Sequence, residues 1–448
     1  MSVYKTRRGG GGNADIINGR TVQLKTSGAA IMPDTFVEFL PAEVTGMDFS
    51  AQKPPVIIDD TATARGMAIT RLTDTTALVA YVTDTGEARV RACSISERGD
   101  LSTGAMTTVS LPAQVYDAEA HRLTDTTALV YFCTRSDAPH AGYCVIVQAA
   151  ENAITHGEPV AAGRAVPLTE SMIYTQTVTE AQTYAVNGLA LTAAGTGSIS
   201  KPPPSETTQT WGVKSIALCR LTNGRVLIDE TLSRWSNGRY YHTQSYADVD
   251  AAGNVTHNGR WTALVPIPTS GTSAEASPWW DCAITRINDS TALFAWLYGG
   301  AGAVYTATAY AAGGEVFTAN TAASDIATNA KTRTLSACMI YEDKLALIAA
   351  DTPAGYCACV ADISGAEVNL RASVRISQIT TAASAETALI SNDYAVVVVP
   401  SSAGYCTAIV IPTAQLPPLI KAAEAKINGL TKETCTAQTA GAVWVPDI

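Results

Sequence analysis

Short apolar runs alternate with polar turns along most of this chain. An apolar run at 66–72 is followed by a polar turn of Thr and Asp at 73–76, and then by a second apolar run at 77–82. Asp and Thr suit tight turns because their side chains bond nearby backbone amides. Valine-rich runs of this length favour extended strands, and no unit sustains a helical period. The pattern predicts an all-β fold of short antiparallel strands.

This strand–turn–strand pattern is repeated. The nine residues RLTDTTALV occur twice, as Arg71–Val79 and as Arg122–Val130. The copies are spaced about 53 residues apart on average, a period typical of repeat architectures. Weaker copies begin at Arg220, Arg286, Ile340 and Ile390, and we place a degenerate copy at Thr177.

Each repeat has room for four short strands joined by turns. Four antiparallel strands at this period are typical of a propeller blade, which buries its faces against its neighbours. We therefore expect a β-propeller over residues 47–415, with seven four-stranded blades as the first choice and six as the runner-up. A sandwich of several jelly-roll domains is the main alternative fold.

Both ends of the chain depart from the repeat. Residues 1–46 contain a glycine spacer at 9–12 and two isolated strand-like runs, which predicts an extended N-terminal arm. Residues 416–448 begin with two prolines, and we expect one or two helical turns over 419–427. Short strands should complete this small C-terminal extension. The expected organisation is therefore an arm, a propeller and an extension.

Charge is sparse and acidic. Charged residues make up 16% of the 448 residues, and the formal net charge is −10. Binding to a nucleic-acid backbone needs clustered Lys and Arg, so no nucleic-acid partner is expected. No apolar stretch reaches the roughly 18 residues of a membrane helix, so we expect no membrane insertion. The first residues lack the apolar core of a signal peptide.

The metal-binding residue types occur without ligand spacing. The ten cysteines include no CxxC pair, and nearly all lie in apolar runs, which predicts buried, reduced thiols. The five histidines form no HExxH or similar motif. His121 lies in strand register before the second repeat, where a satisfied core or rim histidine is the expectation. We predict no metal and no cofactor.

No catalytic residue emerges from the motifs. The chain has neither a GxSxG elbow nor a phosphate-binding loop. The adjacent carboxylates at 59–60 and at 229–230 would point to opposite faces of a strand, and both pairs are expected at turns or edges.

Four arginines do recur at equivalent repeat positions, and in a propeller they could form a ring, as a sialidase-type centre requires. The alternative is that they brace the acidic turn three residues on, which is a structural role. These arginines are Arg71, Arg122, Arg220 and Arg286.

Aromatic residues provide the best candidate recognition surface. Trp235, Tyr240 and Tyr241 flank a Ser-Asn-Gly turn, and Trp279 and Trp280 precede a later repeat. Exposed Trp and Tyr stack on sugar rings and anchor protein interfaces. Ordinary packing between blades is the alternative role for all five.

The C-terminal segment carries a resemblance. Residues 426–430 (KINGL), 431–439 and 441–446 (GAVWVP) together resemble a terminal extension found in structural proteins of tailed bacteriophages of Gram-positive hosts. The resemblance implies a virion protein of the tail, baseplate or fibre, located in the virion after synthesis in the host cytoplasm without a signal peptide. Its expected partners are other virion proteins in a symmetric multi-copy assembly. The alternatives are a host-receptor or glycan-binding propeller and, less favoured, a propeller glycosidase.

Overall fold

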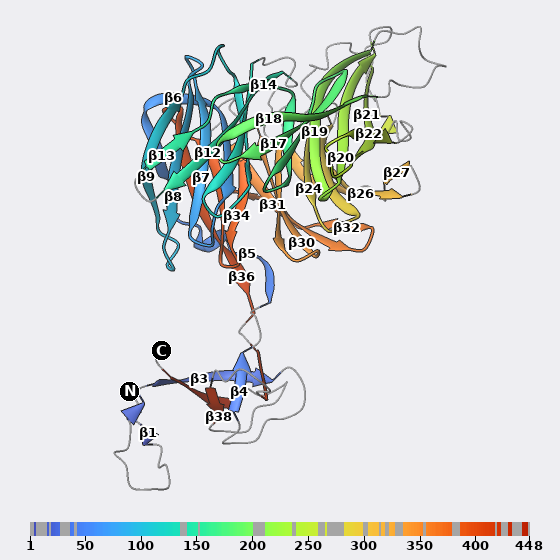
Figure 1. Cartoon of the computed structure of the whole chain (residues 1–448). Helices are drawn as coiled ribbons and strands as arrows, with labels where there is room; N and C mark the ends of the chain where they lie inside the picture. Colours follow the sequence, from blue (N-terminus) through green and yellow to red (C-terminus); the bar gives the residue numbers. More distant parts are fainter. Residues whose placement is uncertain are drawn as a thin grey trace. The chain divides into compact units, whose positions relative to one another are not determined.

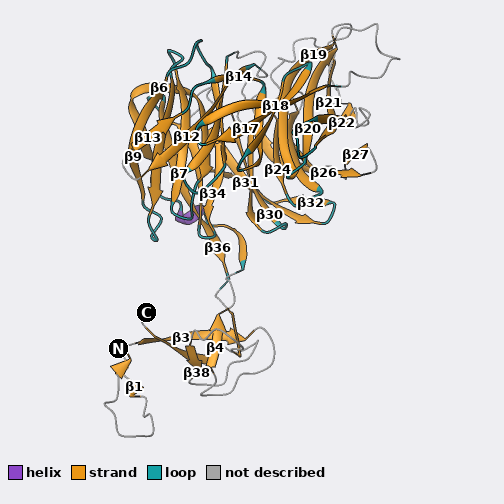
Figure 2. Cartoon of the chain, viewed as in Figure 1, coloured by secondary structure: helices purple, strands orange, loops and turns teal. Residues whose placement is uncertain are grey.

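The computed structural model of the chain is built almost entirely of strands. The helical element among the described residues is one 3-10 turn, η1 (Phe49–Ala51), visible in Figure 2. The structure describes residues 4–5, 16–17, 19–26, 36–39, 43–134, 141–150, 153–199, 211–234, 239–258, 265–266, 282–298, 303–312, 315–318, 322–327, 335–352, 355–378, 386–416, 419–422, 429–431 and 441–446.

The chain divides into two compact units. One unit is residues 46–413, and the other combines the two ends of the chain, residues 1–45 and 414–448. In sequence, the larger unit is therefore an insertion between two halves of the smaller one.

Five small antiparallel sheets are consecutive in the larger unit. In each of them the strands pair in chain order, and in four of them a short extra strand pairs with the third strand. The first two sheets are β10 (Asp117–Arg122), β11 (Thr127–Cys133), β12 (Gly142–Ala150), β13 (Ala153–His156) with β14 (Val160–Ala162), and β15 (Arg164–Thr169), β16 (Met172–Gln176), β17 (Glu180–Asn187), β18 (Ala190–Ser198). The other three are β19 (Trp211–Thr222), β20 (Arg225–Arg234), β21 (Arg239–Val249), β22 (Val255–Asn258) with β23 (Val265–Pro266); β24 (Cys282–Arg286), β25 (Thr291–Tyr298), β26 (Ala303–Ala312), β27 (Glu315–Thr318) with β28 (Ala322–Ala327); and β29 (Leu335–Tyr341), β30 (Leu345–Thr352), β31 (Gly355–Ser364), β32 (Glu367–Leu370) with β33 (Val374–Arg375).

The remaining strands of this unit join into one eight-stranded sheet. The long strand β6 (Val56–Arg71) connects its two parts, because residues 56–63 pair with β36 and residues 64–71 pair with β7. The two ends of the propeller sequence are thereby hydrogen-bonded to each other. The other members are β34 (Glu386–Ser391), β35 (Tyr394–Pro400), β36 (Tyr405–Gln415), β7 (Thr76–Thr83), β8 (Ala88–Ile95), β9 (Leu101–Val109) and β5 (Val44–Met47), which pairs with β36.

The predicted number of blades is corrected by these sheets. In place of seven or six separate four-stranded blades, the described residues form five separate sheets and one eight-stranded sheet. The physical reason is the continuity of β6, which has no turn between its two halves and so fuses the first and last repeats.

The sheets are arranged as a β-propeller (Figure 1). The first strands of successive sheets lie side by side around an axis: β6 contacts β10, β10 contacts β15, and β15 contacts β19. The series continues through β24, β29 and β34, and β34 contacts β6. The ring of first strands is therefore closed.

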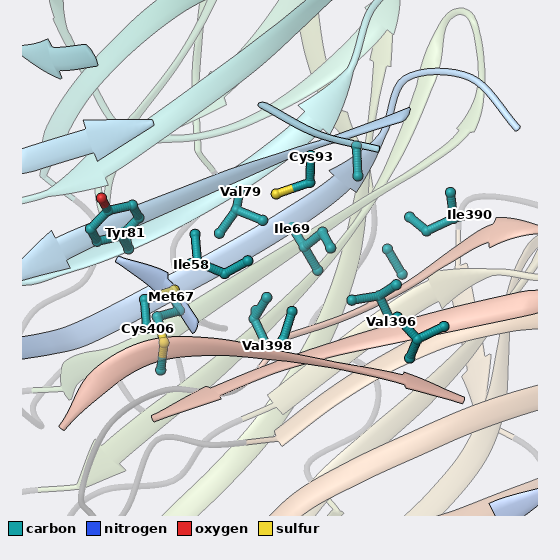
Figure 3. Close-up of a cluster of buried hydrophobic side chains, with 14 of the residues drawn as sticks. Ile58, Met67, Ile69, Val79, Tyr81, Cys93, Ile390, Val396, Val398 and Cys406 are labelled. Carbon is teal, nitrogen blue, oxygen red and sulfur yellow. The ribbon is translucent and has the colours of Figure 1, made fainter. Parts of the chain in front are cut away.

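The apolar core consists of several clusters. The cluster shown in Figure 3 lies within the eight-stranded sheet, where Met67, Val79 and Tyr81 from β6 and β7 pack with Val396 and Cys406 from β35 and β36. Similar clusters lie between the β10 and β15 sheets and between the β15 and β19 sheets. A continuous core is thus built from repeats that cannot bury their faces alone.

The smaller unit is also a β structure. Its strands form a closed five-stranded sheet in the order β3, β37, β4, β38, β39, and β1 (Tyr4–Lys5) pairs with β2 (Ile16–Ile17) separately. The helical turn expected at 419–427 is wrong over Leu419–Ala422, which is a strand paired with both β3 and β4; residues 423–428 lie outside the described residues. The strands are β3 (Gly19–Thr26), β4 (Phe36–Phe39), β37 (Leu419–Ala422), β38 (Gly429–Thr431) and β39 (Gly441–Pro446).

Candidate functional site

The two identical RLTDTTALV stretches occupy equivalent places. Each forms the turn between the first and second strands of its repeat, where Leu72 N donates to Thr76 O and Leu123 N to Thr127 O, both at 2.9 Å. The first and last threonine hydroxyls of each turn lie 2.7 Å apart in both copies. The repeat predicted from the sequence is therefore a repeat of structure.

The position predicted for the degenerate copy of the repeat, at Thr177, is wrong. Thr177 lies in the turn between β16 and β17, whereas the turn between the first and second strands of that sheet is formed by Thr169, Glu170 and Ser171. Ser171 N donates to Thr169 Oγ1 at 3.2 Å, as Thr75 N does to its own turn threonine at 3.3 Å. The sequence Leu-Thr-Glu-Ser at 168–171 was the signal for this copy.

The recurring arginines are occupied by structural contacts. Ion pairs join Arg71 to Asp74, Arg122 to Asp125 and Arg286 to Asp289. This confirms the bracing role for three of the four arginines. Arg220 differs because Asn223 replaces the acidic residue, and its guanidinium donates to the Leu168 carbonyl at 2.9 Å instead.

A small polar cavity lies at the propeller axis. It has a volume of about 120 Å³ and is lined by the first strands of every sheet around the ring. Its charged and imidazole groups come from β10, β15 and β34: Asp117, Glu119, His121, Arg164 and Glu386. The other first strands contribute mainly Ala, Leu, Ile, Met and Cys, so the polar lining is confined to one side.

The polar residues of β10 share one face because they alternate with alanines in the sequence Asp117-Ala-Glu-Ala-His121. The equivalent positions of the first repeat are Gly66, Ala68 and Thr70. Gly66 is required at its position, since a Cβ there would lie 2.5 Å from the Asp117 Cα. The polar face of β10 is not among the candidate sites named from the sequence, although the alternation of its polar residues with alanines was a usable signal.

Within the cavity, Glu119 forms an ion pair with Arg164 of the neighbouring sheet. The His121 ring lies nearby, with its Nε2 atom 4.0 Å from Glu119 Oε2 and without a hydrogen-bond partner. Burial, together with the Arg164 charge, lowers the pKa of His121 to about 4. The imidazole is therefore neutral at pH 7, and His121 is a half-buried histidine of the axial cavity that hydrogen-bonds the Ala165 backbone while its Nε2 atom stays unpaired.

The size of the axial cavity limits its chemistry. A volume of about 120 Å³ corresponds to roughly four water molecules at their liquid volume, below the range of ordinary ligand pockets. No group of three or more His, Cys, Asp or Glu residues in the described ranges is arranged to hold a metal ion. The cavity suits a few ordered waters around the Glu119–Arg164 pair.

A buried hydrogen-bond network connects the β15 and β19 sheets. Tyr174 donates to Gln176 Oε1 at 2.7 Å, and Gln176 Nε2 donates to Glu230 Oε1 at 2.9 Å. Burial, and secondarily the charge of neighbouring Asp229, raises the pKa of Glu230 to about 8. Asp229 and Glu230 were expected at a turn or edge, but both are buried within the interior strand β20.

The other pair of adjacent carboxylates, Asp59 and Asp60, lies in two different environments. Asp59 is buried in β6, and its carboxylate accepts hydrogen bonds from Tyr81 at 2.8 Å, Arg89 at 2.7 Å and Thr61 at 2.7 Å. Burial by itself would raise the pKa of Asp59, but the hydrogen bonds outweigh burial and lower this pKa to about 2. Asp60 is exposed. The expected turn or edge location is thus wrong for Asp59, which anchors the first half of β6 to β7 and β8.

The aromatic candidates are only partly described. Tyr240 and Tyr241 lie at the start of β21, opposite Ser233 and Leu232 of β20, while Trp235, Trp279 and Trp280 lie outside the described residues. The segment 235–238 joins β20 to β21, and residue 281 precedes β24. The start of β19 pairs with the end of β20, as in the pair Trp211 and Arg234.

The described cysteines confirm the expected reduced state. Nine cysteines are free, and all are buried or partly buried, while Cys435 lies outside the described residues. Burial raises the pKa of Cys93 and Cys219 to about 12, so these thiols remain protonated. Among the described residues, no helix is long and apolar enough to cross a membrane.

Comparison with solved structures finds matches of low sequence identity. The BP39L lectin from Burkholderia pseudomallei is 13% identical, with 80% of this chain and 99% of that chain covered and a TM-score of 0.47. A Lactobacillus plantarum protein is 10% identical, with 72% and 88% covered and a TM-score of 0.47. The GH93 α-L-arabinofuranosidase of Fusarium graminearum is 9% identical, with 81% and 98% covered and a TM-score of 0.40. No protein-family model and no curated protein sequence matches the chain.

The strand topology defines the class of protein as a β-propeller with a second unit built from both chain ends.

Proposed function

We propose that this chain is a structural and interaction component of a phage particle, in which the smaller unit tethers the propeller to neighbouring virion proteins. The resemblance of residues 426–446 to phage structural proteins suggests the setting. Tail, baseplate and fibre remain the candidate positions, and multiple copies in a symmetric assembly are the expected arrangement.

The observation that carries the proposal is the joining of the two chain ends in one closed sheet. β3 from the N-terminal segment pairs with both β37 and β39 from the C-terminal segment. β4 likewise pairs with β37 and β38. A propeller inserted between such ends is attached to its tether at two points, which suits the transmission of force better than a single linker.

The repeated Arg–Asp ion pairs favour a structural role for the propeller. The three Arg–Asp pairs recur from sheet to sheet, whereas a single catalytic centre needs residues that differ between sheets. The main argument for a sialidase-type centre was the ring of recurring arginines. Because three of these arginines form structural ion pairs, that argument no longer applies.

The experiment is to purify particles of the encoding phage and quantify this chain against the other virion proteins by mass spectrometry. A fixed stoichiometry is expected. A second arm compares particle binding by the full chain and by a fragment of residues 43–416, which lacks most of the smaller unit. Only the full chain should bind. Abundance in infected-cell lysate combined with absence from purified particles would contradict the proposal.

Host-glycan binding is the second candidate function. It is supported by the sequence, in which Trp and Tyr are clustered at 235–241 and again at 279–280, residue types that stack on sugar rings. Saturable binding to host cell-wall glycan should be lost in Trp235→Ala and in the Trp279→Ala/Trp280→Ala double variant. Trp444→Ala, in β39 of the smaller unit, is the aromatic control and should bind normally.

The glycosidase alternative has its own assay. Incubation of the full chain with host cell-wall glycan should release no reducing sugar. Release that disappeared in Glu119→Gln, a carboxylate facing the propeller axis, would instead establish an enzyme.

A further inference from the structure

A larger hollow lies between two neighbouring sheets. A groove of about 680 Å³ separates the β10 sheet from the β15 sheet at the end where β11 leads to β12 and β16 leads to β17. This volume is within the range of about 300 to 1,000 Å³ that small-molecule sites occupy. The axial cavity, at about 120 Å³, is far smaller. Of these two cavities, the groove is the one whose volume fits an organic ligand.

One wall of the groove carries mainly small residues. Farther along the same interface, Tyr131, Ile146, Ile173 and Tyr184 fill the space between the sheets. Towards the groove, the β10 sheet contributes glycines and alanines at 141–142 and 161–162, together with Thr134 and Tyr143. A Cβ at Gly142 would lie 2.0 Å from the Phe132 carbonyl oxygen, so a larger residue cannot replace it without backbone movement. The open space is thus a consequence of backbone packing.

The opposite wall presents polar side chains from the β15 sheet. Gln182 faces Thr196 across the β17–β18 pair, and Glu180 faces Ser198. The Gln182 Oε1 atom accepts a hydrogen bond from Tyr184 at 2.9 Å, which directs the amide nitrogen away from that contact. Glu180 and Thr196 are exposed, Gln182 is partly buried, and all three line the groove.

These groups select the chemistry of a ligand. The amide donates, the carboxylate accepts, and the Thr and Ser hydroxyls do both. Among the described residues that line the groove, Glu180 is the charged one and none is Lys, Arg or His, so an anionic ligand would meet the Glu180 charge without a cation from these residues. A purely apolar ligand would leave the polar wall desolvated and unpaired, which is costly. A neutral ligand with several hydroxyl groups is not repelled by Glu180, and its hydroxyl groups can pair with the polar wall.

We propose that this groove binds a neutral saccharide, with Glu180 and Gln182 hydrogen-bonding its hydroxyl groups and the glycine–alanine wall admitting the ring. The site is separate from the aromatic segments at 235–241 and 279–280. It is also independent of the tethering role proposed above, because its described lining residues all belong to the larger unit.

The test titrates the full chain by calorimetry with glucose, galactose, mannose, rhamnose and N-acetylglucosamine, and with glucuronic and galacturonic acids as acidic probes. At least one neutral sugar should bind, and the acidic sugars should bind more weakly. Thr196→Trp fills the groove and should weaken binding at least about tenfold, whereas Thr192→Trp on the same strand should leave it unchanged.

A second variant tests the hydrogen-bonding role without changing the volume. Glu180→Gln should weaken binding about tenfold or more, as expected for a charge-assisted hydrogen bond, while exposed Glu158→Gln should have no effect. The proposal is overturned if no neutral sugar binds, if acidic sugars bind more tightly, or if neither Thr196→Trp nor Glu180→Gln alters affinity. Each result is independent of whether the chain is found in phage particles.

Discussion

At the scale of single residues, the buried carboxylates show how strongly environment decides protonation. Glu230 and Asp59 are both buried, and each accepts a hydrogen bond from a neighbouring side chain. Glu230 accepts from a neutral amide, so burial dominates and its pKa rises. Asp59 accepts from an arginine, a tyrosine and a threonine, so hydrogen bonding dominates and its pKa falls. These opposite shifts predict opposite dependences of stability on pH.

The Glu230 prediction concerns the neutral range. Its pKa is raised from 4.5 to about 8, so its contribution to stability is fully present below pH 4.5 and is lost as the pH rises towards 8. Glu230→Gln should therefore flatten the dependence of unfolding free energy on pH across this window, measured by urea unfolding. The exposed Glu170→Gln in the β15 sheet is the control. An unchanged pH slope in Glu230→Gln would contradict the buried, protonated state.

The Asp59 prediction concerns the acidic range and the anchor of β6. The pKa is lowered from 3.8 to about 2, so its stabilisation is present above pH 3.8 and is lost as the pH falls towards 2. Asp59→Ala should cost about 1.5 to 3 kcal/mol at neutral pH, because Tyr81 and Arg89 lose a buried charged acceptor while Arg89 keeps its ion pair with Glu87.

The neighbouring residue provides the control for this variant. Asp60→Ala should change the unfolding free energy by less than about 0.5 kcal/mol, since Asp60 is exposed. Equal effects of the two substitutions in denaturant unfolding would show that Asp59 does not anchor the strand.

At the scale of elements, the turn between the first and second strands is the unit that recurs. The identical residues of the first two repeats make the same backbone and threonine contacts, and the ion pair forms in the repeats that have both the arginine and the aspartate. Where Asn223 takes that place, the arginine finds a backbone carbonyl instead. The backbone geometry of the turn therefore does not depend on the ion pair.

This independence predicts small and equal effects at equivalent positions. Asp74→Ala and Asp125→Ala should each cost about 0.2 to 1 kcal/mol, because exposed ion pairs contribute little. The two aspartates have side chains that are 73% and 70% exposed. Chemical denaturation of both variants provides the measurement. A loss of several kcal/mol in one variant alone would show that the two turns have different roles.

At the scale of the whole molecule, closure and tethering are properties of separate segments. The propeller closes through residues 56–63 of β6, which pair with β36 and lie within the larger unit. The smaller unit uses only residues 1–45 and 414–448. The closing contacts are thus retained when most of the smaller unit is removed.

Two fragments test this division. A fragment of residues 43–416 keeps both halves of β6 and the pairing of β5 with β36, and should fold with a thermal midpoint close to that of the propeller in the full chain. A fragment of residues 64–416 lacks the closing half of β6 and exposes the β36 edge, so it should unfold at lower temperature or aggregate. Comparable midpoints for the two fragments would show that β6 does not close the ring.

Much of the fold followed from local pattern. The repeated RLTDTTALV turns, the alternation of apolar runs and the lack of helical period are features of neighbouring residues, and they indicated an all-β propeller. The bracing of Asp74 and Asp125 by arginines three residues earlier was predictable for the same reason.

The tertiary structure decided what depends on residues distant in sequence. The joining of the first and last repeats by β6, the pairing of Leu419–Ala422 with strands from the N-terminal segment, and the axial face of Asp117, Glu119 and His121 all bring separated segments together. The groove beside Gln182 likewise forms only when two sheets meet. Periodicity determined the strands of this protein, because strand formation is local; long-range packing determined how its sheets close and where hollows remain between them.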